Sequence, residues 1–141
     1  MNKLVAFCIS AAVSLAALSS LAPLATSSRL AHAAEPGDIS IAELKAAMAA
    51  KKVAIVDVNG DDSYADGHIP GAIVFEGKDK LAKALPADKS TLVVAYCGGA
   101  ACNAYRAATK AAESFGYTNV KHLSVGIRGW KAAGEKLEAK K

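Results

Sequence analysis

Two short runs of apolar residues, rich in β-branched side chains, constrain the fold of this chain more than any other feature of its sequence. Residues 53–58 read VAIVDV, and residues 92–96 read LVVAY. A strand with one face in water alternates apolar and polar residues, whereas these runs are apolar at nearly every position, as is typical of strands buried on both faces. Both runs therefore predict strands within a sheet that helices cover on its two sides.

Segments with helical patterns lie between these runs. Ser40 and Glu43 form a capping-box pattern, which predicts a helix that continues to about Ala50. Further helices are predicted at residues 61–67 (one turn), 81–85, 101–115 and 130–139, and further strands at residues 72–75 and 119–123. This alternation predicts an α/β fold with a mostly parallel central sheet, flanked by helices on both faces. Residues 34–38 and the lysine-rich C-terminal end are predicted to be tails.

The strand predicted at residues 92–96 ends at Cys97, which is followed by a loop of small residues and then by a helical pattern. In a parallel sheet, ligands bind beyond the carboxyl ends of the strands, where Cys97 and Asp57 both fall. Backbone N–H groups that small side chains leave uncovered, together with the positive end of a helix, favour a thiolate. We therefore predict Cys97 as a nucleophile and Asp57 as a supporting residue. The predicted anion cradle is the backbone of Gly98, Gly99, Ala100, Ala101, Cys102 and Asn103.

The N-terminus has the layout of a secretory signal peptide. Lys3 supplies a positive charge, residues 4–24 are almost entirely apolar or small, and residues 31–33 read AHA, an A-x-A-type cleavage site. We therefore predict that residues 1–33 are a cleaved signal peptide and that the mature protein is periplasmic or secreted, without stable membrane insertion. The alternative is an uncleaved anchor, because the apolar stretch is nearly long enough to span a bilayer.

Cleavage would leave 108 of the 141 residues, which is enough for one domain with its own core. The formal charge would fall from +4 to +2 through the loss of Lys3 and Arg29. The remaining lysines are spread along the chain, so nucleic acid is not expected as a partner. Cys97 and Cys102 lie too close in sequence for an effective structural disulfide. Their spacing also does not match a metal-ligand pattern, so no metal site is expected.

Four motifs resemble those of rhodanese-like domains and occur in the order of that family. Residues 64–72 read YADGHIPGA, close to the Y-x-x-G-H-I-P-G-A signature, and residues 56–58 read VDV, similar to the DVR element. Residues 96–97 and the small residues after them resemble the active-site loop, and residues 126–130 read GIRGW, similar to the Gly-x-x-x-Trp element. The resemblance covers residues 39–138 and implies a rhodanese-like fold in a single-domain sulfurtransferase.

The resemblance also implies a reaction that passes through a persulfide. Cys97, as a thiolate, would take the sulfane sulfur of a donor such as thiosulfate, a polysulfide or a persulfide, and the anionic persulfide would lie in the cradle of loop N–H groups. A thiol or cyanide would then accept the sulfur. No cofactor and no metal are implied. The expected partners are the small-molecule donor and acceptor, and the identity of any protein acceptor of sulfur is left open.

Two positions depart from the family pattern. Cys102 occupies the sixth position of the loop, where members that use thiosulfate often have Arg or Lys, so a cation for an anionic donor is missing there. Asn59 follows the Asp-Val pair, where the family commonly has Arg. Arg106 and Arg128 could supply charge to the site as supporting residues, or they could be ordinary solvated arginines.

Cys102 also leads to alternative functions. It could resolve a persulfide on Cys97 by forming a disulfide and releasing hydrosulfide, provided that the two side chains face each other. The same pair could work as a periplasmic dithiol/disulfide oxidoreductase. If Cys97 is an inert buried thiol and Cys102 only a small residue in the first turn of the helix, the domain would be a non-catalytic rhodanese-like binding module. Asp57 would then be a turn-former.

Overall fold

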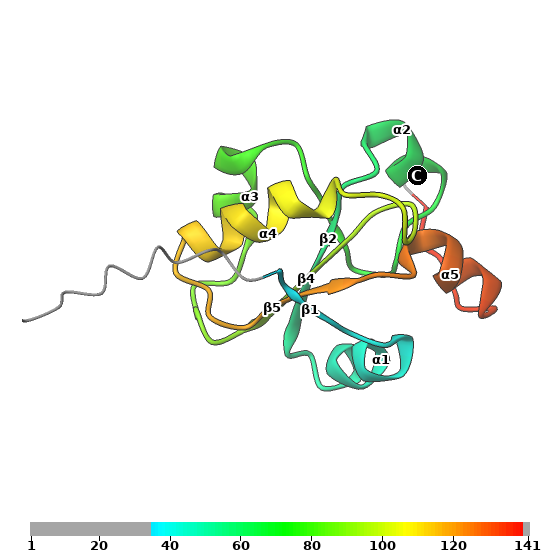
Figure 1. The fold of residues 1–141 in the computed structure, drawn as a ribbon, viewed down its shortest axis with the longest axis horizontal. Coiled ribbons are helices and arrows are strands. Elements are labelled where there is room, and N and C mark those ends of the chain that lie inside the picture. Colours follow the sequence, from blue (N-terminus) through cyan, green and yellow to red (C-terminus); the bar gives the residue numbers. More distant parts are fainter. Residues whose placement is uncertain (1–34, 140–141) are drawn as a thin grey trace, which may run out of the picture. The chain divides into compact units, whose positions relative to one another are not determined.

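The computed structural model describes residues 35–139, which form a five-stranded sheet in which every neighbouring pair of strands is parallel (Figure 1). The strand order is β1-β5-β4-β2-β3, so β4 lies in the middle. The strands are β1 (Gly37–Asp38), β2 (Val53–Asp57), β3 (Ile73–Val74), β4 (Leu92–Tyr96) and β5 (Val120–Leu123). The predicted α/β fold with a parallel central sheet is confirmed.

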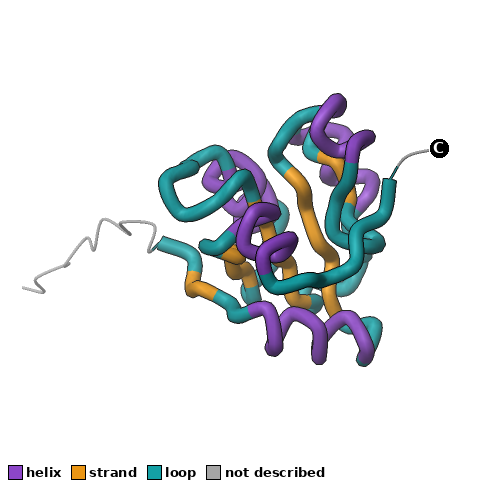
Figure 2. The backbone as a smooth tube through the Cα atoms, turned by 90° about the vertical axis from the view of Figure 1, so that its right-hand side faces the viewer, coloured by secondary structure: helices purple, strands orange, loops and turns teal. Residues whose placement is uncertain are grey.

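The helices of the described part are α1 (Ile41–Ala49), α2 (Asp61–Asp66), α3 (Lys78–Ala84), α4 (Tyr105–Ser114) and α5 (Gly126–Ala132). Helices cover both faces of the sheet, as predicted (Figure 2). On one face, α3 and α4 bury Leu81 and Ala108 in a hydrophobic core. On the other face, α1 and α5 bury Leu44 and Trp130 in a second core.

The central strand β4 is buried on both of its faces. Successive side chains of a strand point to opposite sides of the sheet. Val93, Ala95 and Cys97 accordingly belong to the core under α3 and α4, whereas Val94 and Tyr96 belong to the core under α1 and α5. Burial on both faces explains the unbroken apolar run in the sequence. It also places the Cys97 side chain on the α4 side of the sheet.

The capping box predicted at the start of α1 is present. The amide of Glu43 donates to Ser40 Oγ at 3.2 Å, and the amide of Ser40 donates to Glu43 Oε2 at 2.9 Å. Both donors would otherwise lack a partner within the helix. This reciprocal pair fixes the start of α1 at the residue that the sequence indicates.

The segment predicted to be an N-terminal tail contains β1, so this prediction was wrong. Gly37 and Asp38 pair with Lys121 and His122 of β5. The carboxylate of Asp38 also accepts hydrogen bonds from the N and Oγ of Ser124, at 2.9 and 2.8 Å. A strand of two residues without an apolar run has no periodic pattern, and for this reason the sequence did not indicate it.

Three helices also differ in their bounds from the prediction, and the one predicted over residues 81–85 is α3, which begins earlier, at Lys78. The long helix predicted over residues 101–115 begins only at Tyr105, because the preceding residues form a loop at the end of β4. The helix predicted over residues 130–139 is α5, which starts earlier and ends at Ala132. Gly134 follows with a φ of +72°, and its amide donates to Lys131 O at 3.0 Å in a turn that ends the helix.

The predicted signal peptide, residues 1–33, lies outside the described residues, so cleavage and export stay predictions. Among the helices of residues 35–139, none has the length and apolar character needed to cross a membrane. In the same part of the chain, no group of three or more His, Cys, Asp or Glu side chains is placed to hold a metal ion.

Candidate active site

Cys97 lies directly after the carboxyl end of the central strand β4, where the sequence predicts a ligand site. Its side chain is almost fully buried, with a residue exposure of 3%. Its Sγ lies 3.2 Å from the carbonyl oxygen of Cys102 and 3.9 Å from that of Gly99. The chain turns back at this point because the amide of Cys102 donates to Gly99 O at 2.9 Å. Residues 98–104 therefore form a loop that passes around the sulfur before α4 begins.

The first turn of α5 holds this loop in place. The amide of Ile127 donates to Cys97 O at 2.9 Å, and the N and Nε of Arg128 donate to Gly98 O at 3.3 and 2.9 Å. Gly126 allows this close approach, since a Cβ on it would lie 2.3 Å from Cys97 O. Its φ of +59° is also in the left-handed region that favours glycine. In the sequence, Gly126 stands out only as part of a family motif, and no local pattern indicates this contact.

Burial of Cys97 and the backbone amides around its sulfur shift the pKa of the thiol in opposite directions. Burial raises the pKa of the Cys97 thiol, and the hydrogen bond that it makes with the Cys102 thiol raises this pKa further. The amides of Gly99 and Tyr105 favour the thiolate and oppose this rise without cancelling it. The sequence predicts a loop that favours a thiolate at Cys97. The N–H groups are present as predicted, but burial outweighs them in the resting protein.

Cys102 is half-buried and has the more acidic thiol of the pair. The hydrogen bond with the Cys97 thiol lowers the pKa of Cys102 most, and the amides of Ala104 and Gly98 and the positive charge of Arg128 lower it further. In the singly ionised pair, the shared proton therefore lies on Cys97 and the negative charge on Cys102. Spacing alone did not indicate this distribution of charge, because it depends on which sulfur the core covers.

The six residues of the predicted cradle differ in their burial and in their position relative to the two sulfurs. The amides of Gly98 and Gly99 point toward the two sulfurs. Ala100, Ala101 and Asn103 are exposed at the rim of the loop. The amides of residues 104 and 105, which the sequence analysis assigned to a helix, also point toward the sulfurs. They do so because α4 begins later than predicted and its start faces the loop.

Asp57 supports the site from the end of β2 and is buried. Its carboxylate accepts hydrogen bonds from Tyr96 Oη and from the N and Nδ2 of Asn59, the latter two at 2.7 Å. Tyr96 Oη in turn accepts from the amide of Ile69 at 3.1 Å. Burial and the carboxylate of Asp57 raise the pKa of Tyr96, so the phenol stays a hydrogen-bond donor. Asn59 lies beside the loop, with Oδ1 3.7 Å from the position of a Cβ on Gly98.

The two arginines predicted as supporting residues differ in position. Arg128 lies beside the loop, where its guanidinium contacts the backbone at Gly98 and Gly99. Arg106 instead forms an exposed ion pair with Glu35, with 3.0 Å between Nη2 and Oε1. The structure therefore brings the positive charge of Arg128 to the site, whereas that of Arg106 is paired with a carboxylate at the surface.

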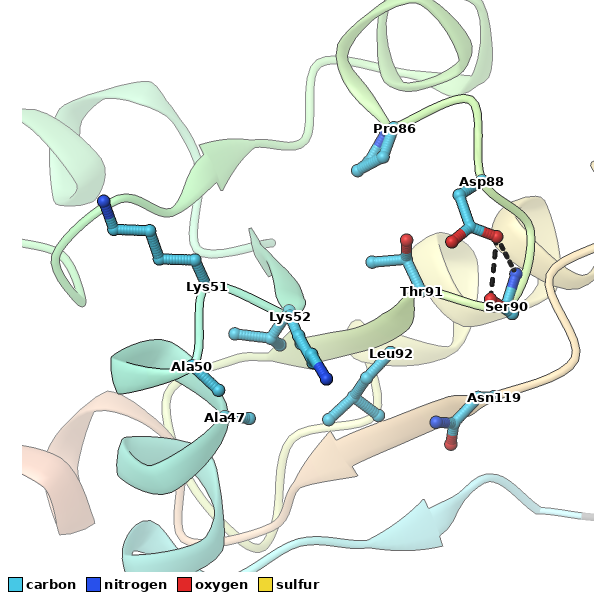
Figure 3. A pocket seen from close by; sticks show the side chains of 11 residues that line it. Ala47, Ala50, Lys51, Lys52, Pro86, Asp88, Ser90, Thr91, Leu92 and Asn119 are labelled. Carbon is cyan, nitrogen blue, oxygen red and sulfur yellow. Dashed lines mark hydrogen bonds between the residues drawn. The ribbon is translucent and has the colours of Figure 1, made fainter.

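A cavity of about 680 Å³ lies at the opposite end of the sheet (Figure 3). Its lining includes the first residues of β2 and β4, Val53 and Leu92, together with Lys51 and Lys52. Because Cys97 follows the carboxyl end of β4, this cavity is separate from the loop that holds the sulfur. A search for the site by the shape of the surface alone would therefore have selected this cavity and missed the loop around Cys97.

A family model described as Rhodanese-like domain matches residues 40–133. This chain belongs to the rhodanese-like family. The match includes β2, the loop after β4 and α5, so it covers all three elements that form the site. It confirms the family that the sequence motifs indicated.

Solved structures also resemble this one in their fold. The BH2092 protein from Bacillus halodurans has a TM-score of 0.63 and 28% sequence identity, covering 73% of this chain and 77% of that one. The thiosulfate sulfurtransferase from Pseudomonas aeruginosa has a TM-score of 0.59 and 27% identity, covering 75% of this chain and 21% of that one.

A curated relative is the HTH-type transcriptional regulator Rv0324 of Mycobacterium tuberculosis. It is 40% identical to this rhodanese-like domain over 99 residues, which is 68% of this chain and 42% of the regulator. The chain therefore spans less than half the length of that relative. The shared part supports membership of the rhodanese-like family.

The contact between α5 and the loop predicts a large loss of stability for Gly126→Ala. The left-handed backbone and the overlap with Cys97 O should together lower the free energy of unfolding by about 2–4 kcal/mol. Gly134→Ala is the matched control, because its φ is +72° but no atom lies within 4 Å of an added Cβ. It should cost only about 1 kcal/mol. Equal losses for the two variants in urea unfolding would contradict the role of this contact.

The hydrogen bond between the thiols predicts an order of alkylation. Iodoacetamide should modify Cys102 at lower pH than Cys97, because the pKa of Cys102 is lowered and that of Cys97 is raised. Cys97→Ala removes the donor, so the pKa of Cys102 should rise and its alkylation midpoint should move to higher pH. Cys97→Ser keeps a hydroxyl donor and should shift the midpoint less. A midpoint unchanged by Cys97→Ala would show that the thiols do not share a proton.

Proposed function

We propose that this protein is a sulfurtransferase that carries sulfane sulfur as a persulfide on Cys97. The observation that carries this proposal is a buried thiol at the carboxyl end of the central strand, enclosed by a tight loop whose Cys102 carbonyl oxygen lies 3.2 Å from its sulfur. The amides of Gly99 and Tyr105 favour a negative charge on this sulfur. A thiol in that position gains little from the amides while it is neutral, but an anionic persulfide would gain much more. The fold-level similarity to a thiosulfate sulfurtransferase supports the same reaction.

In the first step, Cys97 Sγ attacks the outer sulfur of the donor and forms a new sulfur–sulfur bond. The sulfur–sulfur bond of the donor breaks, and with thiosulfate as the donor, sulfite leaves with the electron pair. Cys97 loses its proton as it attacks, and the proton passes to solvent or, when Cys102 is ionised, to the Cys102 thiolate. A thiol or cyanide then attacks the outer sulfur, and Cys97 leaves as a thiolate that takes up a proton again.

The donor that the site favours is a small anion such as thiosulfate, a polysulfide or a persulfide. The family's cation at the sixth loop position is replaced by Cys102, but the guanidinium of Arg128 lies against the same loop. A positive charge beside the sulfur attracts an anionic donor, and the exposed rim of the loop leaves the approach open. The acceptor is a thiol or cyanide, and a protein thiol is a further candidate.

We also propose that the reaction takes place in the periplasm or outside the cell. The charge at Lys3, the apolar residues 4–24 and the AHA sequence at residues 31–33 support export with cleavage of residues 1–33. Edman sequencing of the protein secreted or exported by a bacterial host should give Ala34 as the first residue. An N-terminus at Met1 on the exported protein would contradict this proposal.

The hydrogen bond between the two thiols favours a second function, that of a dithiol/disulfide oxidoreductase. Cys97 and Cys102 are both free and lie side by side in the loop. Exchange with a disulfide substrate would then oxidise the pair without any sulfur adduct. The similarity to a transcriptional regulator is the observation behind a third reading, a non-catalytic binding module.

Mass spectrometry of the anaerobic, reduced protein distinguishes these functions. Thiosulfate or inorganic tetrasulfide should add about 32 Da, one sulfur atom, to the Cys97 peptide of the Cys102→Ser variant. The Cys97→Ser variant is the matched control and should gain no sulfur in the loop peptide. A disulfide formed in wild type with a disulfide substrate, but no adduct in Cys102→Ser, would favour the oxidoreductase. Neither product would favour the binding module.

Removal of the positive charge at Arg128 predicts weaker binding of an anionic donor. Arg128→Gln keeps an N–H donor for Gly98 O but should raise the KM for thiosulfate about fivefold with little change in kcat. Arg106→Gln removes the same charge at a surface ion pair and should leave both constants unchanged. The effect of Arg128→Gln should shrink in high salt. Equal KM values for the two variants would contradict a role of Arg128 in donor binding.

A further inference from the structure

The proposed transfer needs one nucleophilic sulfur, but the loop holds two. The turn closed by the hydrogen bond from Cys102 N to Gly99 O brings the fifth residue after Cys97 back over the end of β4. As a result, the carbonyl oxygen of Cys102 lies 3.2 Å from Cys97 Sγ, and the Cys102 side chain packs against the core that contains Cys97, close enough for each thiol to shift the pKa of the other. The side chain of Cys102 is therefore next to the atom that would become the inner sulfur of the persulfide.

Cys102 packs against the core that contains Cys97, but its surroundings also suit a nucleophile. Its side chain is half-buried, so solvent can take up its proton. The amides of Gly98 and Ala104 and the charge of Arg128 favour its thiolate. By contrast, a cysteine that only fills space in the core is usually buried among apolar groups and keeps its proton.

We propose, on the basis of the sulfurtransferase function above, that Cys102 resolves the Cys97 persulfide and releases its outer sulfur as hydrosulfide. The thiolate of Cys102 attacks Cys97 Sγ and forms the Cys97–Cys102 disulfide. The bond between Cys97 Sγ and the outer sulfur breaks, and hydrosulfide leaves with its electron pair. Two cysteine sulfurs are oxidised to a disulfide while one sulfane sulfur is reduced to sulfide. A thiol reductant, either a small thiol or a dithiol protein, returns the disulfide to the two thiols.

Attack on the inner sulfur is favoured over attack on the outer one by the burial of Cys97. Attack of Cys102 on the outer sulfur would move that sulfur to Cys102 and leave a buried thiolate at Cys97. The neighbouring thiol could not then supply a proton, because its own sulfur would be the nucleophile. Attack on Cys97 Sγ leaves no charge in the core, since the small anion departs and the disulfide is neutral. The substrate class is therefore sulfane sulfur, and the product is sulfide. A thiol reductant is consumed in each cycle.

The test uses thiosulfate with a radioactive outer sulfur, under anaerobic conditions and without reductant. Wild-type protein should release one labelled hydrosulfide per molecule, and its mass should fall by about 2 Da as the disulfide forms. The Cys102→Ser variant should instead retain the label on Cys97 as an adduct of about 32 Da. Its release of hydrosulfide should be at least about tenfold lower than that of wild type. Cys102→Ala serves as a second variant in case serine disturbs the loop.

The outcomes of this experiment distinguish a failure of the resolving role of Cys102 from a failure of the proposed sulfurtransferase function. If wild type and both Cys102 variants all keep the adduct and release no sulfide, Cys102 does not resolve the persulfide, but sulfur transfer to Cys97 stands. If neither Cys102 variant takes up sulfur from thiosulfate or tetrasulfide, the sulfurtransferase function itself is contradicted. A disulfide that forms in wild type without stoichiometric labelled sulfide also overturns the inference, because direct oxidation then accounts for it.

Discussion

The hydrogen bonds from the first turn of α5 to the carbonyl oxygens of Cys97 and Gly98 are the interactions on which the site depends. A peptide group is planar, and its N–H and C=O point in opposite directions. Because α5 binds the carbonyls of Cys97 and Gly98, the N–H groups of Gly98 and Gly99 point away from α5. Gly126 permits the contact because it has no Cβ to overlap with the loop. A loop of small residues would otherwise sample many conformations, and the helix selects one of them. The local geometry around the sulfur thus comes from a long-range contact.

A buried polar network also supports the loop, from the carboxyl ends of β2 and β4. Asp57 and Tyr96 join the carboxyl ends of two neighbouring strands, and Asn59 extends the network to the loop. An unpaired polar group in this interior would cost about 1–3 kcal/mol, so the strand ends are held in one arrangement. Because Asn59 is neutral, the network adds no cation near the sulfur. The positive charge beside the loop comes from Arg128 on α5 instead. The site therefore differs from the usual family pattern in the source of its charge.

Most of the fold could be predicted from the sequence because its signals are local. The apolar runs at residues 53–58 and 92–96 became β2 and β4, and the capping box became the start of α1. The strand β1 was missed because it has only two residues, a glycine and an aspartate, and its backbone pairing with β5 gives no apolar pattern in the sequence. In the site, the positions of Cys97 and Cys102 were evident from the sequence, but the distribution of their shared proton was not. That distribution depends on burial by helices distant in the sequence.

In the proposed function, the loop uses its two sulfurs to accept sulfur as a persulfide and to discharge it. The central claim is that amides of the loop and of the start of α4 bind the persulfide of Cys97, and a crystal structure of the sulfur-loaded Cys102→Ser variant tests it most directly. The account predicts an additional sulfur atom bonded to Cys97 Sγ, within hydrogen-bonding distance of the amides of Gly99 and Tyr105. A loaded protein in which the added sulfur lies on another residue, or points away from both amides, would contradict it.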